Sequence, residues 1–99
     1  MDYQVILSTS ARADLRKIVR YISFDSPDRA LSFGMFLISR TRLLAQSPEL
    51  GRIVPECEDE SVREIIVRSY RIVYRVHHSR RLIEVIRFWH AARNTPEIE

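Results

Sequence analysis

Residues 61–94 constrain the fold most, because apolar and polar side chains alternate through three successive segments of this stretch. Alternation with a period of two is typical of strands that have one buried face. Short polar turns at Ser69 and at residues 78–81 separate the segments, which predicts an antiparallel meander. The three predicted strands are Val62 to Arg68, Tyr70 to His77 and Leu82 to Trp89.

The middle predicted strand has two different faces. Tyr70, Ile72, Tyr74 and Val76 share one face, because side chains of a strand point alternately to its two sides. Arginines alternate with other side chains on the second face. We expect helices to cover the first face and to leave the second one open. The residues of that open face are Arg71, Val73, Arg75 and His77.

The N-terminal half predicts one strand and two helices. Tyr3 to Leu7 alternates as a strand, and Ser8-Thr9-Ser10 then offers N-cap hydroxyls for a helix from about Ala11 to Phe24. Ser26 and Pro27 suit the N-cap and the first position of a second helix, which runs to about Gln46. The order β-α-α-β-β-β predicts an α+β fold: a two-helix N-terminal hairpin packed on one face of a small antiparallel sheet. We expect the first strand to pair beside the last strands of the meander.

The second predicted helix carries two apolar stripes. Ala30, Phe33, Leu37, Thr41 and Leu44 line one face with helical spacing. Either both stripes belong to the core, or the second one receives a partner's helix or a second copy of this chain. The second stripe, on a neighbouring face, consists of Leu31, Met35 and Ile38.

Length and composition predict a single domain over residues 1–99, with apolar residues for one core and no room for a large cofactor cleft. We therefore expect no cofactor. No apolar run approaches the length of a membrane span, and the N-terminus shows no secretory signal. The lone Cys57 cannot form an internal disulfide, which favours a reducing compartment. These features predict a cytoplasmic protein with no membrane partner.

Positive charge is concentrated in the C-terminal part. Residues 63–99 contain eight basic and four acidic side chains, a net charge of +4, whereas residues 1–62 sum to −1. All basic residues except Lys17 are arginines, whose planar guanidinium suits phosphate and carboxylate groups. The bias favours a polyanion or an acidic protein as partner, and the alternative is that these arginines simply solvate strand faces.

The sequence offers a partial set of groups for RNA cleavage. That reaction needs a base, an acid and cations on the phosphate. Arg71 and Arg93 suit the phosphate, and His90 suits the acid or base. The alternatives are that His90 caps the sheet edge and that Arg93 forms a salt bridge holding the tail. Three histidines and one cysteine at these spacings match no zinc pattern, so we expect no metal site.

Several short motifs together resemble toxins of the ParE/RelE superfamily, which belong to type II toxin–antitoxin systems. The resemblance covers nearly the whole chain, and its most specific part is a Tyr-Arg-Ile-Val-Tyr strand followed later by His-x-x-Arg. The matching pieces are Ser10-Ala11, Asp14-Leu15, Tyr21-Ile22, Pro27, Ala30, Leu43-Leu44, Pro48, Gly51, residues 70–74, residues 83–86 and residues 90–93.

This resemblance implies a cognate antitoxin, ParD-like and of the ribbon-helix-helix class, and growth arrest by the free toxin. ParE-like members inhibit DNA gyrase and RelE-like members cleave messenger RNA on the ribosome. Arg71 and Arg93 match phosphate-contacting arginines of the RelE-like enzymes. Their lysines and C-terminal tyrosine are absent, since the chain has Glu56 to Glu60 before the meander and no tyrosine in the tail. A gyrase inhibitor useful in plasmid stabilization is therefore the first hypothesis. A ribosome-dependent endoribonuclease and a non-toxic binding module are the alternatives.

The candidate residues follow from these hypotheses. Arg71, His90 and Arg93 would be catalytic only in a ribonuclease. Operator DNA would be contacted only through the antitoxin, and the assembly would be a homodimer or a toxin–antitoxin heterotetramer. The candidates for target or antitoxin binding are Arg71, Arg75, Arg87, Trp89, His90, Arg93, Leu31, Met35 and Ile38.

Overall fold

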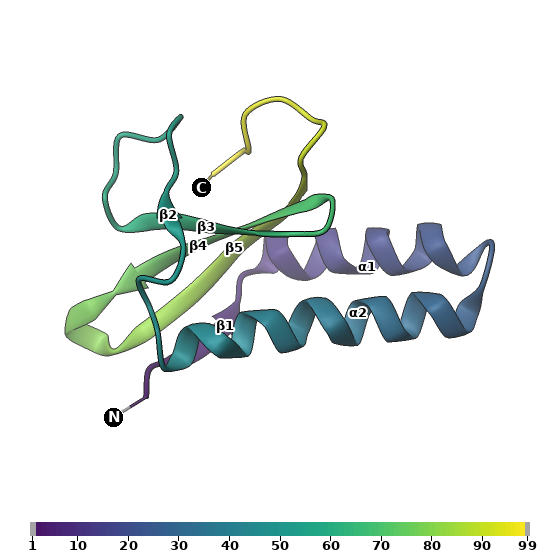
Figure 1. Ribbon diagram of the computed structural model, residues 1–99, viewed down its shortest axis with the longest axis horizontal. Helices are drawn as coiled ribbons and strands as arrows, with labels where there is room; N and C mark the ends of the chain where they lie inside the picture. The colour runs from purple at the N-terminus through teal and green to yellow at the C-terminus, as the bar shows by residue number, and fades with distance from the viewer. Residues whose placement is uncertain (1, 99) are drawn as a thin grey trace.

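The computed structural model describes residues 2–98 and contains two helices and five strands (Figure 1). The chain order confirms the predicted strand, two helices and meander, and adds one short strand before the meander. The elements are β1 (Gln4–Leu7), α1 (Thr9–Ser23), α2 (Pro27–Arg42), a 3-10 turn at Leu43–Ala45, β2 (Arg52–Ile53), β3 (Val62–Val67), β4 (Tyr70–His77), a 3-10 turn at His78–Arg80 and β5 (Leu82–His90).

The five strands form one sheet in the order β1-β5-β4-β3-β2. The first strand pairs beside the last meander strand as expected, but β1 runs parallel to β5, with Gln4 opposite Leu82. The other neighbours are antiparallel, which confirms the predicted meander, and the parallel β1 makes the five-stranded sheet a mixed one. Alternation of side chains places a strand's faces but carries no information about its direction, and the helical hairpin returns the chain so that β1 and β5 point the same way.

The helix starts follow the predicted capping residues. The Ser8 hydroxyl accepts a hydrogen bond from the Ala11 N–H at 3.0 Å and caps α1. The Ser26 hydroxyl accepts from the Arg29 N–H at 3.3 Å, and Pro27 occupies the first turn of α2. Both contacts satisfy N–H groups that have no partner inside the helix. The predicted second helix therefore begins where expected and ends as a 3-10 turn at Ala45.

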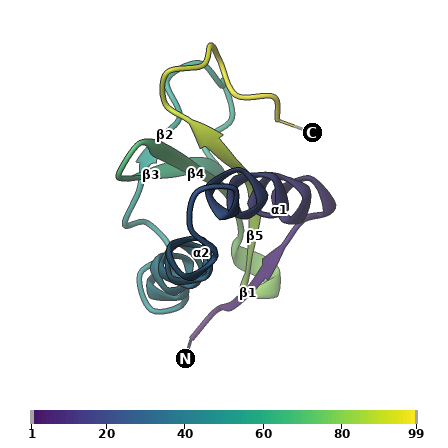
Figure 2. The same ribbon diagram turned by 90° about the vertical axis from the view of Figure 1, so that its right-hand side faces the viewer.

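The two helices lie side by side on one face of the sheet (Figure 2). Leu37 and Leu44 of the hairpin are fully buried against Ile72, Tyr74 and other strand residues. Gly34 lets the helices approach closely, because a Cβ there would lie 2.9 Å from the Val19 Cγ2 atom. The first predicted stripe of α2 is therefore the core stripe.

The opposite face of the sheet is also covered, which corrects the expectation of an open face. The loop after β2 and the C-terminal tail cross this face on the side away from the helices (Figure 1). Val54 packs on Val62, Val73 and Ile86 in a second apolar cluster, to which Cys57 and Ile98 add. The chain thus has three layers: the two helices, the sheet, and a thin lid formed by the loop between β2 and β3 and by the C-terminal tail after β5.

Two local features of the sheet were not predicted. The first is the pairing of Arg52 and Ile53 with β3. A two-residue strand is too short to show alternation, so periodicity cannot reveal it. A bulge on β5 leaves Ile86 between the partners of Val73 and Tyr74. Its extra residue reverses the alternation, so that Phe88 joins the helix-side core with Val85.

Candidate functional site

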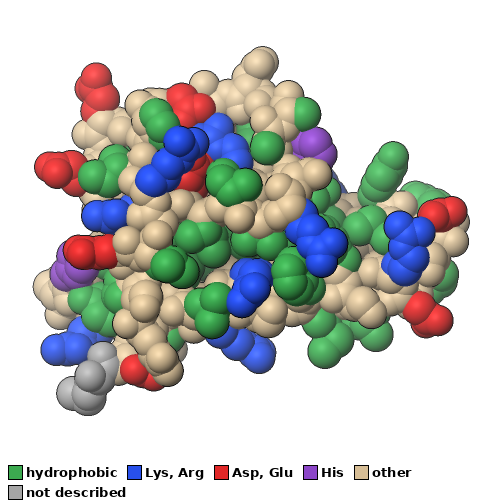
Figure 3. Space-filling model, viewed as in Figure 1, with side chains coloured by type: hydrophobic (Ala, Val, Ile, Leu, Met, Phe, Trp, Pro, Cys, Tyr) green, Lys and Arg blue, Asp and Glu red, His purple; other side chains and the backbone are tan. Residues whose placement is uncertain are grey.

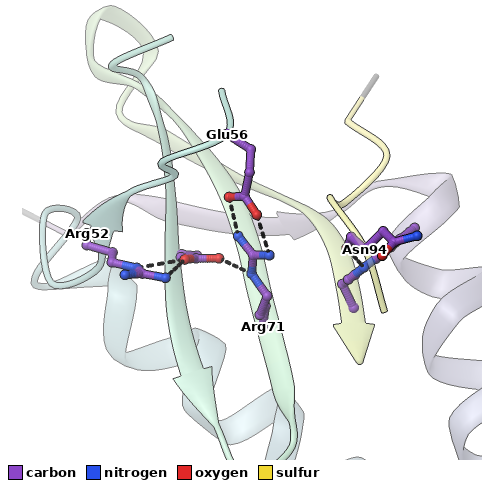
Figure 4. A network of polar contacts seen from close by, with 6 residues as sticks. Arg52, Glu56, Arg71 and Asn94 are labelled. Carbon is purple, nitrogen blue, oxygen red and sulfur yellow. Dashed lines mark hydrogen bonds and ion pairs between the residues drawn. The ribbon is translucent and has the colours of Figure 1, made fainter. Parts of the chain in front are cut away.

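Arg71 lies at the centre of a polar network on the lid side of β4 (Figure 4). Its Nη1 and Nη2 atoms donate to the two Glu56 oxygens at 2.9 and 2.7 Å, and its Nε donates to Glu64. Glu64 also accepts from the Arg52 Nε at 2.7 Å. Only 10% of the Arg71 side chain is exposed. Each of the three guanidinium nitrogens of Arg71 therefore donates a hydrogen bond to a carboxylate.

The charges within this network neutralise one another. The hydrogen bonds from Arg71 lower the pKa of Glu56 from 4.5 to about 2, despite the opposing effect of burial. The same contacts with Glu56, followed by those with Glu64, raise the pKa of Arg71 above its already high value. The expectation that Arg71 lies on an open face is wrong, because the acidic loop that contains Glu56 folds onto it. Sequence reasoning missed Glu56, whose only sequence signal was its place in the acidic segment before the meander.

Arg75 lies on the same face nearer the other end of β4. Its Nη2 atom is 3.6 Å from the Asp59 carboxylate, and the side chain is partly exposed. Hydrogen bonds from Ser61 lower the pKa of Asp59, and the nearby Arg75 adds to this effect. The loop that covers Arg71 thus also supplies a carboxylate to Arg75.

Arg87 and Trp89 are structural anchors at the end of β5. Arg87 donates through Nε and Nη2 to the two Asp14 oxygens, both at 2.8 Å. Asp14, on α1, also accepts the Phe88 N–H at 3.0 Å, beyond the point where β1 stops pairing with β5. Trp89 is buried, and its Nε1 donates to the Asn94 carbonyl at 2.8 Å. The structure brings Arg87 and Trp89 together, with the Arg87 guanidinium 4.8 Å from the indole centroid.

Arg93 also packs on the indole of Trp89. Its guanidinium carbon is 3.8 Å from the Trp89 ring centroid, within the range of a cation–π contact. The residue itself is exposed. No salt bridge holds Arg93 among residues 2–98, so the predicted salt-bridge alternative is replaced by stacking. Arg93 therefore presents a positively charged plane at the end of the sheet.

His90 faces the helix side, away from Arg71. It pairs with Tyr70 across the strands, and their rings meet edge to face at 5.2 Å. Its Nδ1 accepts the Ala92 N–H at 3.1 Å. Arg71 pairs instead with Trp89 on the lid side. The three residues named for a ribonuclease are thus divided between two faces of the sheet, and the structure does not bring His90 to Arg71.

A pocket of about 460 Å³ opens beside His90, between the helical hairpin and the β3–β4 turn. Burial raises the pKa of the Tyr70 phenol there, and Tyr21 adds to the effect. Arg68 holds a left-handed conformation at this turn, with φ of 56°. A non-glycine residue in that conformation is uncommon, and it allows a two-residue turn where the sequence predicted that the strand would continue to Arg68 and turn at Ser69. Besides His90, the lining residues, which sequence reasoning missed as site residues, are Ile22, Arg29, Ser32, Phe33, Arg68, Ser69 and Tyr70.

The second stripe of α2 is exposed. Leu31 and Met35 keep 64% and 63% of their surface accessible, and Ile38 is half-buried. Tyr21 and Phe24 extend this apolar surface at the tip of the hairpin, a contribution that the sequence pattern did not indicate. Figure 3 shows hydrophobic side chains along α2 and at that tip. Of the two alternatives for the stripe, the structure excludes burial in the chain's own core.

Two further classes of site are absent from residues 2–98. No group of three or more histidine, cysteine, aspartate or glutamate side chains in this range is placed to hold a metal ion. Neither helix in this part of the chain is long and apolar enough to cross a membrane.

Comparison with known proteins identifies the family. A family model described as the ParE toxin of the type II toxin–antitoxin system parDE matches residues 5–95. The chain belongs to this ParE toxin family. It is therefore the toxin component of a type II toxin–antitoxin system within the ParE/RelE superfamily, as its motifs indicated. A comparison by sequence with curated proteins gives no match.

Solved structures share the ParE/RelE fold. The chromosomal ParDE system of P. aeruginosa matches with a TM-score of 0.73 and 22% identity, over 89% of this chain and 95% of that one. The RelBE2 toxin–antitoxin complex of Mycobacterium tuberculosis matches with a TM-score of 0.69 and 20% identity, over 91% and 99%. A double arginine mutant of the free E. coli toxin RelE gives 0.66 and 22%, over 93% and 86%. At these identities the likeness concerns the fold, and both toxin groups share it.

Proposed function

We propose that this ParE-family toxin arrests growth by inhibiting DNA gyrase, without cleaving RNA, and that a cognate antitoxin neutralises it. The observation that carries the proposal is the state of Arg71. Its guanidinium is paired with Glu56 and Glu64 and is nearly buried. A phosphate could reach it only after the Glu56 carboxylate had left.

The acid–base groups support the same proposal. General acid–base catalysis needs the proton-transfer group and the phosphate-binding cations around one reacting centre. His90 faces the helix-side pocket, whereas Arg71 faces the lid and Arg93 stacks on Trp89. Binding to a protein target does not require these groups to meet at one centre, because the binding energy comes from surface contacts.

The exposed stripe of α2 is the proposed antitoxin-binding surface. A ParD-like antitoxin of the ribbon-helix-helix class would lay the apolar face of a helix on Leu31, Met35 and Ile38. His90, Arg93 and the partly exposed Arg75 then remain for acidic groups of the target or the antitoxin. The antitoxin would link the toxin to operator DNA. The assembly would be a toxin–antitoxin heterotetramer or would contain a toxin homodimer, and it would act in the cytoplasm.

Induction of the toxin alone in bacteria tests this proposal. We expect filamentous growth and gyrase-linked DNA breaks, with ribosome-bound messenger RNA intact, and rescue when the antitoxin is co-expressed. Cuts within codons that precede any DNA break would establish the ribonuclease alternative instead. Unchanged growth would favour a non-toxic binding module, whose sheet only holds a partner.

A further inference from the structure

A row of arginines follows the outer face of α1. Arg12, Arg16 and Arg20 recur every fourth residue and are exposed, whereas Ala11 and Ile18 are buried. Residues four apart lie on the same side of a helix, so these three guanidinium groups form one stripe, the α1 stripe. Lys17 is also exposed and adds a fourth cation to this helix.

The α1 stripe has no carboxylate of its own helix to offset it. Asp14 is the only acidic residue of α1, and its oxygens are taken by Arg87 and the Phe88 N–H. Among residues 2–98, no ion pair reaches the cations of the stripe or Lys17. Four arginines of the sheet and one of α2, in contrast, do have carboxylate partners, namely Arg52, Arg71, Arg75, Arg87 and Arg29.

Folding gains nothing from this arrangement. Like charges four residues apart destabilise a helix by about 0.2–0.5 kcal/mol per pair. Arg12 also lies near the positive end of the helix dipole, where the first turn contains no acidic residue to offset it. A polyanion would convert this repulsion into attraction.

We infer that the α1 stripe binds the phosphate backbone of duplex DNA directly. The identification of DNA rests on the proposed function, because gyrase acts on duplex DNA. The stripe from Arg12 to Arg20 is about 12 Å long at 1.5 Å per residue. Duplex DNA carries about one charge per 1.7 Å of axis, so about seven phosphate charges lie within that length. Guanidinium groups match phosphate oxygens in geometry as well as charge.

Such binding is independent of base sequence, since phosphate contacts position a protein without reading bases. It therefore differs from operator recognition, which is assigned to the antitoxin. It gives the toxin its own contact with DNA near its target.

The salt dependence of DNA binding tests the α1 stripe. Fluorescence anisotropy of a short duplex of arbitrary sequence would be followed with the purified toxin between about 50 and 200 mM salt. The variant R16Q/R20Q should reduce the magnitude of the slope of log K against log salt by about two, because each substituted arginine no longer neutralises a phosphate. The control R42Q/R80Q removes the same charge from exposed residues outside α1 and should leave the slope unchanged.

Several results would overturn the inference. One is that the wild-type toxin does not bind the duplex at low salt. Others are that wild type and R16Q/R20Q give equal slopes, or that both double variants decrease the slope equally. A further one is that the toxin binds single-stranded RNA but not duplex DNA. Thermal unfolding checks the fold, and R16Q/R20Q should be as stable as wild type because glutamine favours helices and the repulsion is relieved. Because gyrase is absent from this assay, its outcome is separate from that of the proposed function.

Discussion

The Arg71 guanidinium is held by two carboxylates that differ in their exposure to water. The Glu64 side chain is fully buried on β3, whereas the Glu56 side chain keeps 34% of its surface exposed in the lid loop. A buried charge that loses its partner is costly, because neither water nor another group takes the partner's place. An exposed carboxylate contributes less, since solvent screens it. Glu64 should therefore contribute more to the stability of the fold than Glu56 does.

The first prediction compares neutral substitutions at these two positions. Glu64→Gln should lower the free energy of unfolding by about 3 kcal/mol, because it removes the buried carboxylate that Arg71 and Arg52 share and leaves Arg71 with Glu56 alone. Glu56→Gln should cost about 1 to 2 kcal/mol. Denaturant unfolding of both variants measures the difference. The reverse order of the two costs would contradict the network.

The second prediction concerns pH. The pKa of Glu56 is lowered to about 2 in the folded chain from 4.5, so the folded state favours the ionised carboxylate. Its contribution to stability is fully present above the unfolded pKa and is lost as pH falls toward about 2. The difference in unfolding free energy between wild type and Glu56→Gln should hence be constant from neutral pH to about pH 5 and shrink below it. A difference that does not depend on pH would show that Glu56 and Arg71 are not paired in solution.

The sequence pattern predicted which face of a strand each side chain occupies, but not what covers that face. Alternation correctly placed Arg71 and Tyr70 on opposite sides of β4. It could not predict the lid, because the position of Glu56 depends on the second apolar cluster and not on neighbours in sequence. Trp89 was likewise named as a binding residue, yet the tail returns to accept its indole N–H and buries it.

Among the elements, α2 separates folding from recognition on its two faces. Leu37 is buried in the core, whereas Leu31 and Met35 face solvent. The third prediction is that L31S/M35S leaves the free energy of unfolding within about 0.5 kcal/mol of wild type. The same variant should weaken antitoxin binding by about tenfold or more, because apolar anchors dominate such interfaces. Isothermal titration calorimetry with the cognate antitoxin measures the change.

Leu50→Ser provides the matched control for that experiment. Leu50 is 56% exposed and lies in the turn before β2, away from the stripe. It should alter neither stability nor antitoxin affinity. If L31S/M35S binds the antitoxin as tightly as wild type, the stripe is not the antitoxin surface.

The connection from α2 to β2 supplies the fourth prediction. The Tyr74 hydroxyl donates to the Pro48 carbonyl at 2.8 Å and accepts the Gly51 N–H at 2.9 Å. A Cβ at Gly51 would overlap the Glu64 backbone carbonyl, which cannot move without breaking the β2–β3 pairing. Gly51→Ala should hence cost about 2 to 3 kcal/mol in thermal or denaturant unfolding.

Gly34→Ala is the comparison for Gly51→Ala. Its Cβ would meet only the Val19 side chain, which can shift, and alanine has the higher helix propensity. We expect a clearly smaller cost at Gly34. Equal costs would indicate that the Tyr74 junction is more deformable than its contacts suggest.

Element starts were predictable because they depend on local chemistry. Ser8, Ser26 and Pro27 mark the helix starts through their own hydrogen bonds and backbone restriction. Strand β2 and the bulge at Ile86 were not predictable, because both arise from pairing with distant strands. The parallel direction of β1 was not predictable for the same reason, because β1 pairs with β5, which is distant in sequence.

In the whole molecule, each side of the sheet has a different role. The helix side carries the main core, the His90 pocket and the exposed stripe of α2. The lid side keeps Arg71 paired with carboxylates. The order of elements and the family motifs predicted the fold and the toxin–antitoxin class. They did not predict that the lid covers the face expected to meet nucleic acid, and this covering supports the proposal that gyrase is the target.

A side-by-side assay of gyrase supercoiling and of cell-free translation, using one preparation of the toxin, tests this central claim most directly. We expect the toxin to inhibit supercoiling in proportion to its concentration, while translation proceeds and ribosome-bound messenger RNA stays uncut. The antitoxin should restore supercoiling when added in equal amount. Unchanged supercoiling at excess toxin, together with cleavage of messenger RNA on the ribosome, would contradict it.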